Sequence, residues 1–131
     1  MSHFVTIRTE LREREHLIAA LREFGLPLDE GDGAALPVHG DQRRAEEAEI
    51  VVHAGPGVDI GFRRGRDGYE VVADWYRVEQ RTRLQRKDFL AELNRRYALS
   101  VVRAQAREQN LLLEEETLPN GDVVVTLSER A

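Results

Sequence analysis

Hydrophobic residues recur along this chain with two different periods, and each period predicts one type of element. Residues 3–9 alternate loosely and are rich in Val, Ile, Thr and Phe, which predicts an opening strand. A helix over about residues 12–24 is then predicted by apolar residues at spacings of three and four, namely Leu17, Ile18, Leu21 and Phe24. Gly25 and Pro27 follow, which is typical of a helix that ends at this point.

The middle of the chain returns to a period of two. Residues 49–53 form a short apolar run before Gly55-Pro56-Gly57, a strong turn sequence. Ile60 and Phe62 then alternate with polar neighbours, and two glycines reverse the chain within residues 65–68. The returning segment places four residues on one face, namely Tyr69, Val71, Ala73 and Trp75. This pattern predicts an antiparallel hairpin in which residues 60–64 pair with residues 69–76.

The last third of the chain holds a helical stripe and a second hairpin. From Lys87 the spacing of apolar residues becomes four, four, four and three, at Phe89, Leu93, Tyr97, Val101 and Ala104. We expect this helix to reach about Glu108. Residues 111–116 and 122–128 then flank Pro119-Asn120-Gly121, and an Asn-Gly pair between alternating segments is a standard hairpin signal.

The predicted order of elements is therefore β-α-β-β-β-β-α-β-β, which indicates an α+β fold. Strands grouped around two helices, without regular β-α-β alternation, favour an antiparallel sheet with both main helices on one face. A chain of 131 residues is predicted to form a single domain. Residues 26–48 contain two prolines and several glycines and acids, so we expect an irregular connection there, with residues 36–39 as a short edge strand.

The amino-acid composition indicates where in the cell the protein is located and which classes of partner suit it. Cysteine is absent, and no apolar run approaches the roughly 20 residues of a spanning helix, so we expect a cytoplasmic protein with no membrane contact. The net charge of −5 is uneven, because residues 60–107 carry a net +6 and the remainder carries −11. A basic middle between acidic flanks makes nucleic acid an unlikely partner, although the local charge leaves that class open.

Candidate chemistry begins with the histidines. His3, His16, His39 and His53 show none of the spacings of common metal sites, so no metal is predicted. The glycines around Gly55 do not match a dinucleotide-binding or phosphate-binding loop, and no cofactor is predicted.

Two aspartates are the candidates for catalytic carboxylates. Asp59 and Asp74 each lie at a predicted strand end, near Arg63, Arg64 and Arg77. Together with His3 they could line a pocket and act as acid and base, which would make the protein an enzyme of unrecognised type. The simpler interpretation, which we favour, is that Asp74 fixes a strand end through backbone N–H groups while the arginines are solvated.

A third candidate site combines aromatic and cationic residues. Trp75 and Tyr76 precede a run of five cations, namely Arg77, Arg81, Arg83, Arg86 and Lys87. Such a set could bind a protein partner, or stack bases and follow the backbone of single-stranded nucleic acid, and we rank the protein interface first. The simplest alternative is that Trp75 caps the core. The acidic run Glu114-Glu115-Glu116 could protect an edge strand or complement a basic surface, including the cationic run of a second copy.

Four segments resemble one known family. They are residues 59–76 (DIGFRRGRDGYEVVADWY), 2–8 (SHFVTIR), 89–98 (FLAELNRRYA) and the acidic run and hairpin at 111–127, and only residues 26–48 fall outside the resemblance. The chain resembles the hypothetical chloroplast reading frame thirty-five family, an uncharacterised group of plastids, cyanobacteria and other bacteria. The resemblance implies a fold but no reaction, and its members are often encoded near ATPases of the AAA+ class. It implies a non-catalytic adaptor that binds a protein, such as an AAA+ ATPase.

Overall fold

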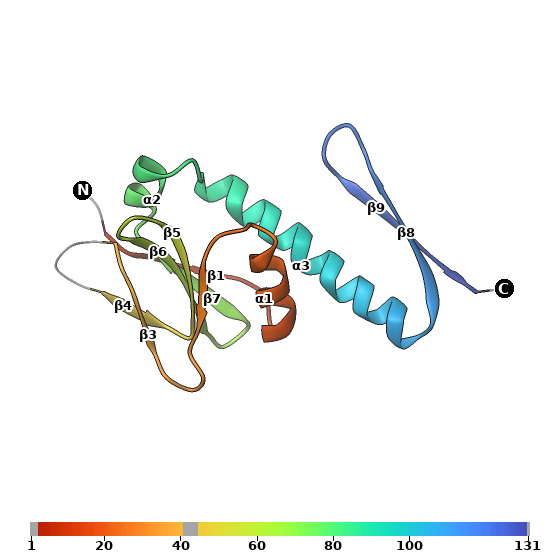
Figure 1. Ribbon diagram of the computed structural model, residues 1–131, viewed down its shortest axis with the longest axis horizontal. Helices are drawn as coiled ribbons and strands as arrows, with labels where there is room; N and C mark the ends of the chain where they lie inside the picture. The colour runs from red at the N-terminus through yellow and green to blue at the C-terminus, as the bar shows by residue number, and fades with distance from the viewer. Residues whose placement is uncertain (1–2, 41–44, 131) are drawn as a thin grey trace. The chain divides into compact units, whose positions relative to one another are not determined.

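The computed structural model describes residues 3–40 and 45–130 of the chain (Figure 1). The chain divides into two compact units, residues 1–97 and residues 98–131, with the division inside a long helix. The first unit is built on a five-stranded antiparallel sheet with the strand order β1-β7-β6-β5-β2. In that order the strands are Val5–Arg8, Tyr69–Ala73, Val58–Arg64, Ile50–Gly55 and Leu28–Glu30. The predicted α+β fold is confirmed.

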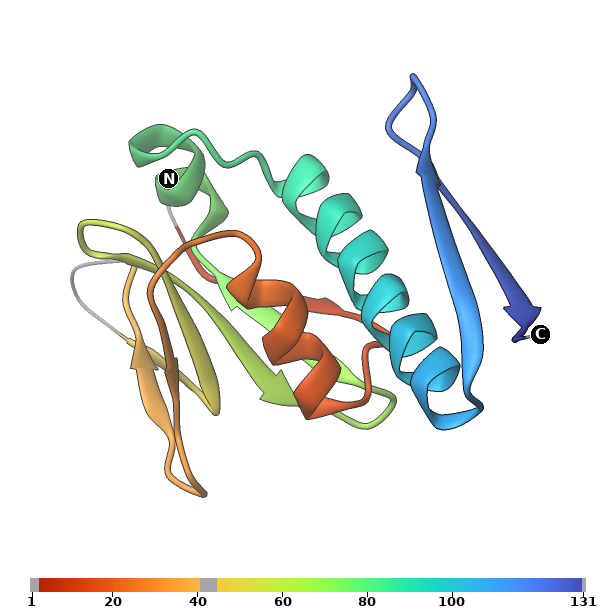
Figure 2. The same cartoon turned by 45° about the vertical axis from the view of Figure 1, so that its right-hand side comes forward.

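One face of the sheet carries the helices. Figure 2 shows α1 (Arg14–Arg22) beside the first part of α3 (Arg86–Glu108), with both helices covering the same face. The apolar stripes predicted from the sequence form this layer, because Leu17, Leu21 and Leu93 are all buried. They meet inward-facing strand residues in the main core, including Ile50, Val52, Ile60, Phe62, Tyr69 and Val71. Gly25 follows α1 with φ of 73°, a conformation that glycine adopts without a steric penalty.

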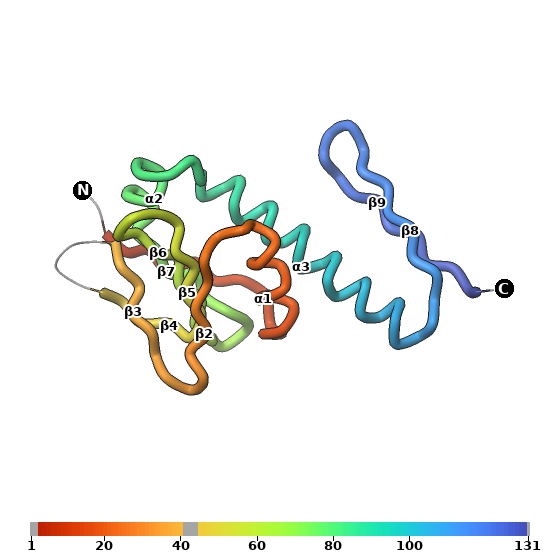
Figure 3. Tube along the Cα trace, viewed as in Figure 1, coloured from red at the N-terminus to blue at the C-terminus, as the bar shows by residue number. Residues whose placement is uncertain are grey.

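The opposite face of the sheet is covered by a small hairpin. After β2 the chain enters β3 (Leu36–Val38), which pairs antiparallel with β4 (Glu46–Ala48), and then continues into β5 (Figure 3). Val38 and Ala48 pack on Val51 in a second, smaller core. The hairpin lies close to the sheet at Gly61, where an added Cβ would collide with a methyl group of Val38 and lie 2.9 Å from the Cβ of Ala48.

Residues 26–48 are more regular than the irregular connection expected there, although the short strand expected at residues 36–39 is confirmed as β3. The segment holds three strands, β2, β3 and β4, of three residues each. Three residues show too few alternations for a period to be read. These strands are held by pairing with other parts of the chain, for example Leu28 with Val52 in β5.

The central hairpin is confirmed except at its end. β6 and β7 pair antiparallel, with Ile60 opposite Ala73 and Arg64 opposite Tyr69. The prediction that residues 75 and 76 continue the strand is wrong, because the helix α2 (Trp75–Arg81) begins there. The carboxylate of Asp74 accepts a hydrogen bond of 3.2 Å from the backbone N–H of Arg77, which caps the helix at its start.

The second unit contains the last part of α3 and a terminal hairpin. β8 (Leu111–Thr117) pairs antiparallel with β9 (Val123–Glu129), as the Asn-Gly turn signal predicted. Asn110, with φ of 52°, takes the chain from the helix into β8. Among the described residues of this unit, only Ala106 of α3 is buried, so the hairpin itself has no buried residue. Throughout the described parts of the chain, every helix is too short or too polar to cross a membrane.

Candidate functional site

The strand register brings both predicted aspartates to one end of the sheet. His53 of β5 lies directly opposite Asp59 of β6, and Ile60 lies opposite Ala73 of β7. Continuing the second pairing by one residue places Asp74 beside Asp59. Directly opposite residues of antiparallel strands point to the same face of a sheet. The two carboxylates therefore belong to one row of side chains, on the face that carries β3 and β4.

The segment that follows β3 covers this row. The backbone N–H of His39 donates a hydrogen bond of 2.8 Å to the carboxylate of Asp59. At Gly40 an added Cβ would lie only 2.7 Å from the Cβ of Asp74 and 3.2 Å from the ring of Phe4. Only glycine allows so close a crossing of the chain. Both aspartates are consequently buried, with exposed fractions of 3% for Asp59 and 0% for Asp74.

Two histidines share the carboxylate of Asp59. Oδ2 of Asp59 lies 3.0 Å from Nδ1 of His39, and Oδ1 lies 2.7 Å from Nδ1 of His53. Nε2 of His53 lies 2.8 Å from Oδ2 of Asp29 in the edge strand β2. We call these four residues, Asp29, His39, His53 and Asp59, the aspartate–histidine cluster.

The geometry of this cluster favours the charged form of His53. Both ring nitrogens of His53 face carboxylate oxygens, and only the imidazolium form has an N–H on each nitrogen. The hydrogen bond to Asp29 raises the pKa of His53 above its usual 6.5. Burial acts in the opposite direction, while the hydrogen bond and the negative charge of Asp59 raise the pKa further. His53 therefore joins the edge strand β2 to the middle of the sheet through a charge.

Asp74 has a different partner from Asp59. Its Oδ1 caps α2, and its Oδ2 lies 3.7 Å from Nε of Arg77 in an ion pair. Asp74 thus fixes the junction between β7 and α2, close to the role that the simpler interpretation of the sequence gave it. His3 is exposed and precedes β1, whereas both carboxylates are buried. Both carboxylates are therefore closed off from solvent, whereas a catalytic pocket would need to present them to a substrate.

His39 is the member of the cluster that solvent can reach. Its side chain is more than half exposed, and its Nδ1 is held by the buried carboxylate of Asp59. A carboxylate that orients an imidazole in this way can prepare the other ring nitrogen to take up a proton. Neither His39 nor His53 was predicted from the sequence as a site residue. The signal for His53 was present, because a turn centred on Pro56 places residues 53 and 59 opposite one another.

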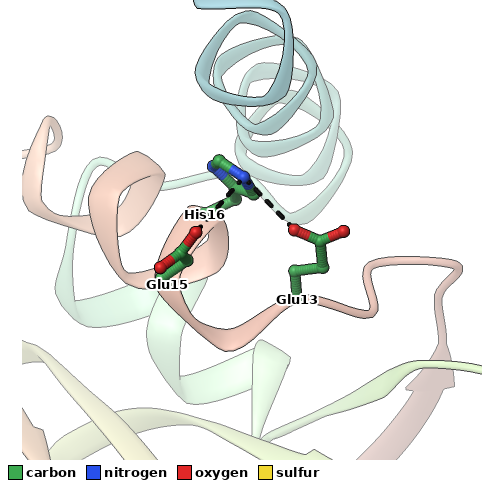
Figure 4. Close-up of side chains that lie close together, drawn as sticks. All are labelled: Glu13, Glu15 and His16. Carbon is green, nitrogen blue, oxygen red and sulfur yellow. Dashed lines mark ion pairs between the residues drawn. The ribbon is translucent and has the colours of Figure 1, made fainter. Parts of the chain in front are cut away.

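A second histidine cluster lies at the start of α1. Nε2 of His16 is 3.2 Å from a carboxylate oxygen of Glu13 and 3.7 Å from one of Glu15 (Figure 4). Among the described residues, these three side chains bring ligand atoms close enough to share a metal ion. Both carboxylates are exposed, and acidic residues in the first turn of a helix stabilise it through the helix dipole. This local role accounts for the cluster without an ion.

The aromatic and cationic residues that were selected from the sequence differ in how far they are buried. Trp75 is only 4% exposed and packs against Phe89, with the two rings 5.9 Å apart. Its indole therefore belongs to the core and offers little surface to a partner, which is the simplest alternative that we considered. Tyr76 is 53% exposed, and its hydroxyl accepts a hydrogen bond from Gln80. Arg77 is half-buried beside Asp74.

The remaining cations are exposed and follow Tyr76 closely in the sequence. We call these residues the basic corner, which consists of Tyr76, Arg81, Arg83, Arg86 and Lys87. All five residues are exposed, and they extend from α2 into the first turn of α3. Arg81 donates a hydrogen bond of 3.4 Å to the carbonyl of Pro56.

The terminal hairpin has one face that combines apolar and acidic side chains. Because Glu116 pairs with Val124 and Leu112 pairs with Ser128, these residues share a face with Glu114. We call Leu112, Glu114, Glu116 and Val124 the hairpin face. Leu112 and Val124 are 41% and 44% exposed, and together with Tyr76 and Leu127 they are the large exposed apolar side chains of the described residues.

The other face of the hairpin is tied to α3. Glu115 accepts two hydrogen bonds, of 3.0 and 2.8 Å, from the guanidinium of Arg103. These bonds lower the pKa of Glu115 below its usual 4.5. The acidic run of the sequence is therefore split, because Glu115 is paired within the chain while Glu114 and Glu116 point to the opposite face.

The comparison with protein families gives a match to residues 20–126, by a model described as "Protein of unknown function (DUF1257)". The chain belongs to this family. The match extends from the second half of α1 into β9, so it includes the aspartate–histidine cluster, the basic corner and the hairpin face. It also spans residues 26–48, which the resemblance of sequence segments left out, while residues 2–8 lie outside it. Neither a curated protein nor a solved structure matches the chain.

Proposed function

We propose that this protein is a non-catalytic adaptor that acts by binding other proteins. The observation that supports the proposal is the terminal hairpin, in which no residue is buried and the apolar side chains of Leu112, Val124 and Leu127 are exposed. A two-stranded hairpin is only marginally stable in water, and one that buries its apolar side chains against a partner gains stability from binding. The hairpin thus has the properties of a surface that binds another protein.

The basic corner adds a second surface suited to protein contact. It presents one aromatic side chain, Tyr76, among the exposed cations of α2 and α3. Tyr and Arg are residues that frequently dominate the binding energy of protein interfaces. Binding of single-stranded nucleic acid is less well supported than the sequence suggested, because the indole of Trp75 is buried and cannot stack on bases.

The proposal extends to the setting of the protein. The chain resembles the hypothetical chloroplast reading frame thirty-five family, whose members are often encoded near AAA+ ATPases, and we propose an ATPase of this class as a partner in the cytoplasm. The support for this partner is association between genes, since no contact within the molecule identifies an ATPase.

Affinity capture from the cells that make the protein tests the proposal. Partners retained by the tagged full chain are identified by mass spectrometry, and capture is repeated with Leu112→Ser and Val124→Ser combined. We expect the double variant to lose the partners, because it removes the exposed apolar side chains of the hairpin face. Leu118→Ser, at the tip of the same hairpin and outside the hairpin face, is the matched control. Recovery of the chain without partners at low salt would contradict the adaptor function.

A second candidate, acid–base catalysis, is favoured by the exposed imidazole of His39 on the buried Asp59. A panel of model esters and phosphoesters tests it. Turnover that is lost in His39→Ala and kept in His16→Ala would support catalysis, whereas equal turnover in both variants would exclude His39 as a base.

A further inference from the structure

We infer that the hairpin face of one copy binds the basic corner of a second copy, so that the chains associate head to tail. This inference rests on the proposed function, because it assigns a partner to the surfaces described above. The occupant is a second copy because one chain carries two exposed surfaces whose charges and apolar side chains complement each other.

The two surfaces carry opposite charges. Residues 76–87 hold five cations and one anion, while residues 111–130 hold five anions and one cation. On the hairpin face, Glu114 and Glu116 point away from the side on which Glu115 pairs with Arg103. Opposite charges across an interface steer association and fix its orientation.

Each surface also carries exposed apolar side chains. Tyr76 lies among the cations, and Leu112 and Val124 lie among the anions. Each surface therefore combines exposed apolar side chains with charged ones, as protein interfaces do. Contact between the two surfaces would remove these side chains from water, and at the same time place the carboxylates opposite the guanidinium groups.

Contacts between two identical surfaces are unfavourable. Two hairpin faces brought together would place four carboxylates in one contact, and two basic corners would place their cations in contact. Like charges across an interface cost several kcal/mol, roughly, so neither surface suits a two-fold dimer with itself. Opposite charges are paired only when the hairpin face of one copy meets the basic corner of another. Two copies can make this contact twice, in a reciprocal two-fold dimer, or each copy can make it with a different neighbour, in a closed ring or an open filament.

Sedimentation velocity of the purified full chain over a range of concentrations tests this inference. We expect species larger than the monomer to grow with concentration at low salt, and to dissociate at about 0.5 M salt because exposed charges are screened there. The variant Glu114→Lys/Glu116→Lys and the variant Arg83→Glu/Arg86→Glu should each be monomeric, with association weakened at least tenfold. Melting curves that match the wild type show that each variant is folded.

A mixture of the two variants is the decisive arm. In the mixture, each reversed surface meets a surface of opposite charge, so we expect equimolar mixing to restore the large species. The control variant, Asp32→Lys/Glu47→Lys, makes the same charge change at exposed residues outside both surfaces and should associate like the wild type.

Two results would overturn the inference: a monomeric wild type at every concentration, or a mixture of the two variants that stays monomeric. The proposed function fails in a different way. A monomeric protein that still captures a foreign partner through the hairpin would overturn only the head-to-tail contact, whereas self-association without any foreign partner would overturn only the adaptor function.

Discussion

Raising the pH through the pKa of His53 should destabilise the first unit of the chain, because the aspartate–histidine cluster depends on an imidazolium. Both ring nitrogens of His53 face carboxylates, at 2.7 Å from Asp59 and 2.8 Å from Asp29. When the ring loses a proton, only one of these hydrogen bonds can remain, and the other nitrogen presents a lone pair to a carboxylate. The edge strand β2, which carries Asp29, should be the first element to loosen.

The direction of the effect follows from the raised pKa of His53. A group whose pKa is higher in the folded state binds its proton more tightly there, so it stabilises the fold fully below its unfolded pKa of 6.5. This contribution decreases as the pH rises above 6.5, and it is lost above the folded pKa. Stability should therefore fall on the alkaline side of neutrality and should not fall on the acidic side through this group.

The magnitude follows from the exposure of each pair. A hydrogen bond from a charged donor to a buried carboxylate contributes about 1.5–3 kcal/mol, and the carboxylate of Asp59 is buried. The side chain of His53 is 39% exposed and that of Asp29 is 64% exposed, so solvent screens the second pair to about 0–1 kcal/mol. A neutral ring loses the screened bond to Asp29 and keeps the bond to Asp59, which without the charge of the donor contributes about 1 kcal/mol less, so we expect a total loss of about 1–2 kcal/mol between pH 6 and pH 9.

Urea denaturation at several pH values between 6 and 9 measures this loss. His53→Gln removes the titrating group, and His3→Gln, at an exposed histidine before β1, is the matched control. The pH dependence of the free energy of unfolding should be reduced in His53→Gln and unchanged in His3→Gln. Equal pH dependence in the wild type and His53→Gln, or a wild type that becomes more stable towards pH 9, would refute the reasoning.

Three further predictions concern packing and the hairpin. Leu93→Ala should lower the free energy of unfolding by roughly 2–5 kcal/mol, because Leu93 is fully buried in the main core, while Leu112→Ala at an exposed site should change it little; urea denaturation of both variants decides this. Gly61→Ala should lower the melting temperature, because an added Cβ would collide with Val38, and a variant as stable as the wild type would show that β3 is not packed there. Glu115→Gln should speed amide hydrogen exchange in β8 and leave β6 unaffected, since it weakens the contact with Arg103 in the second unit only; equal protection in wild type and variant would contradict this.

Long periodic segments of this protein were predictable from the sequence, because burial of one face imposes a period on every residue along an element. The stripe that begins with Phe89 and Leu93 indicated α3, and both residues are buried in the core. The alternation around Ile60 and Val71 indicated the central hairpin, and the Asn-Gly pair indicated the turn between β8 and β9. In each case the signal is local, so neighbouring residues are sufficient to show it.

The short elements and the clustered side chains were decided by tertiary structure. β2, β3 and β4 have three residues each, which is too short for a period, and their strands form by pairing with distant partners. The strand expected at Trp75 is a helix, because the capping bond of Asp74 to Arg77 and the burial of the indole outweigh the alternation.

The residues of the candidate site were likewise predictable only in part from the sequence. The sequence singled out Asp59 by its place at a strand end, but His39 and His53 reach it from segments 20 and 6 residues away. The exposed cations of the basic corner were visible as a run of charge, whereas the burial of Trp75 among them was not. Charge and periodicity are properties of neighbouring residues, and a sequence reports them directly. The register between strands and the packing of β3 across the sheet decide which side chains share a hydrogen bond and which are removed from water. Both the register and this packing are set only in the folded chain.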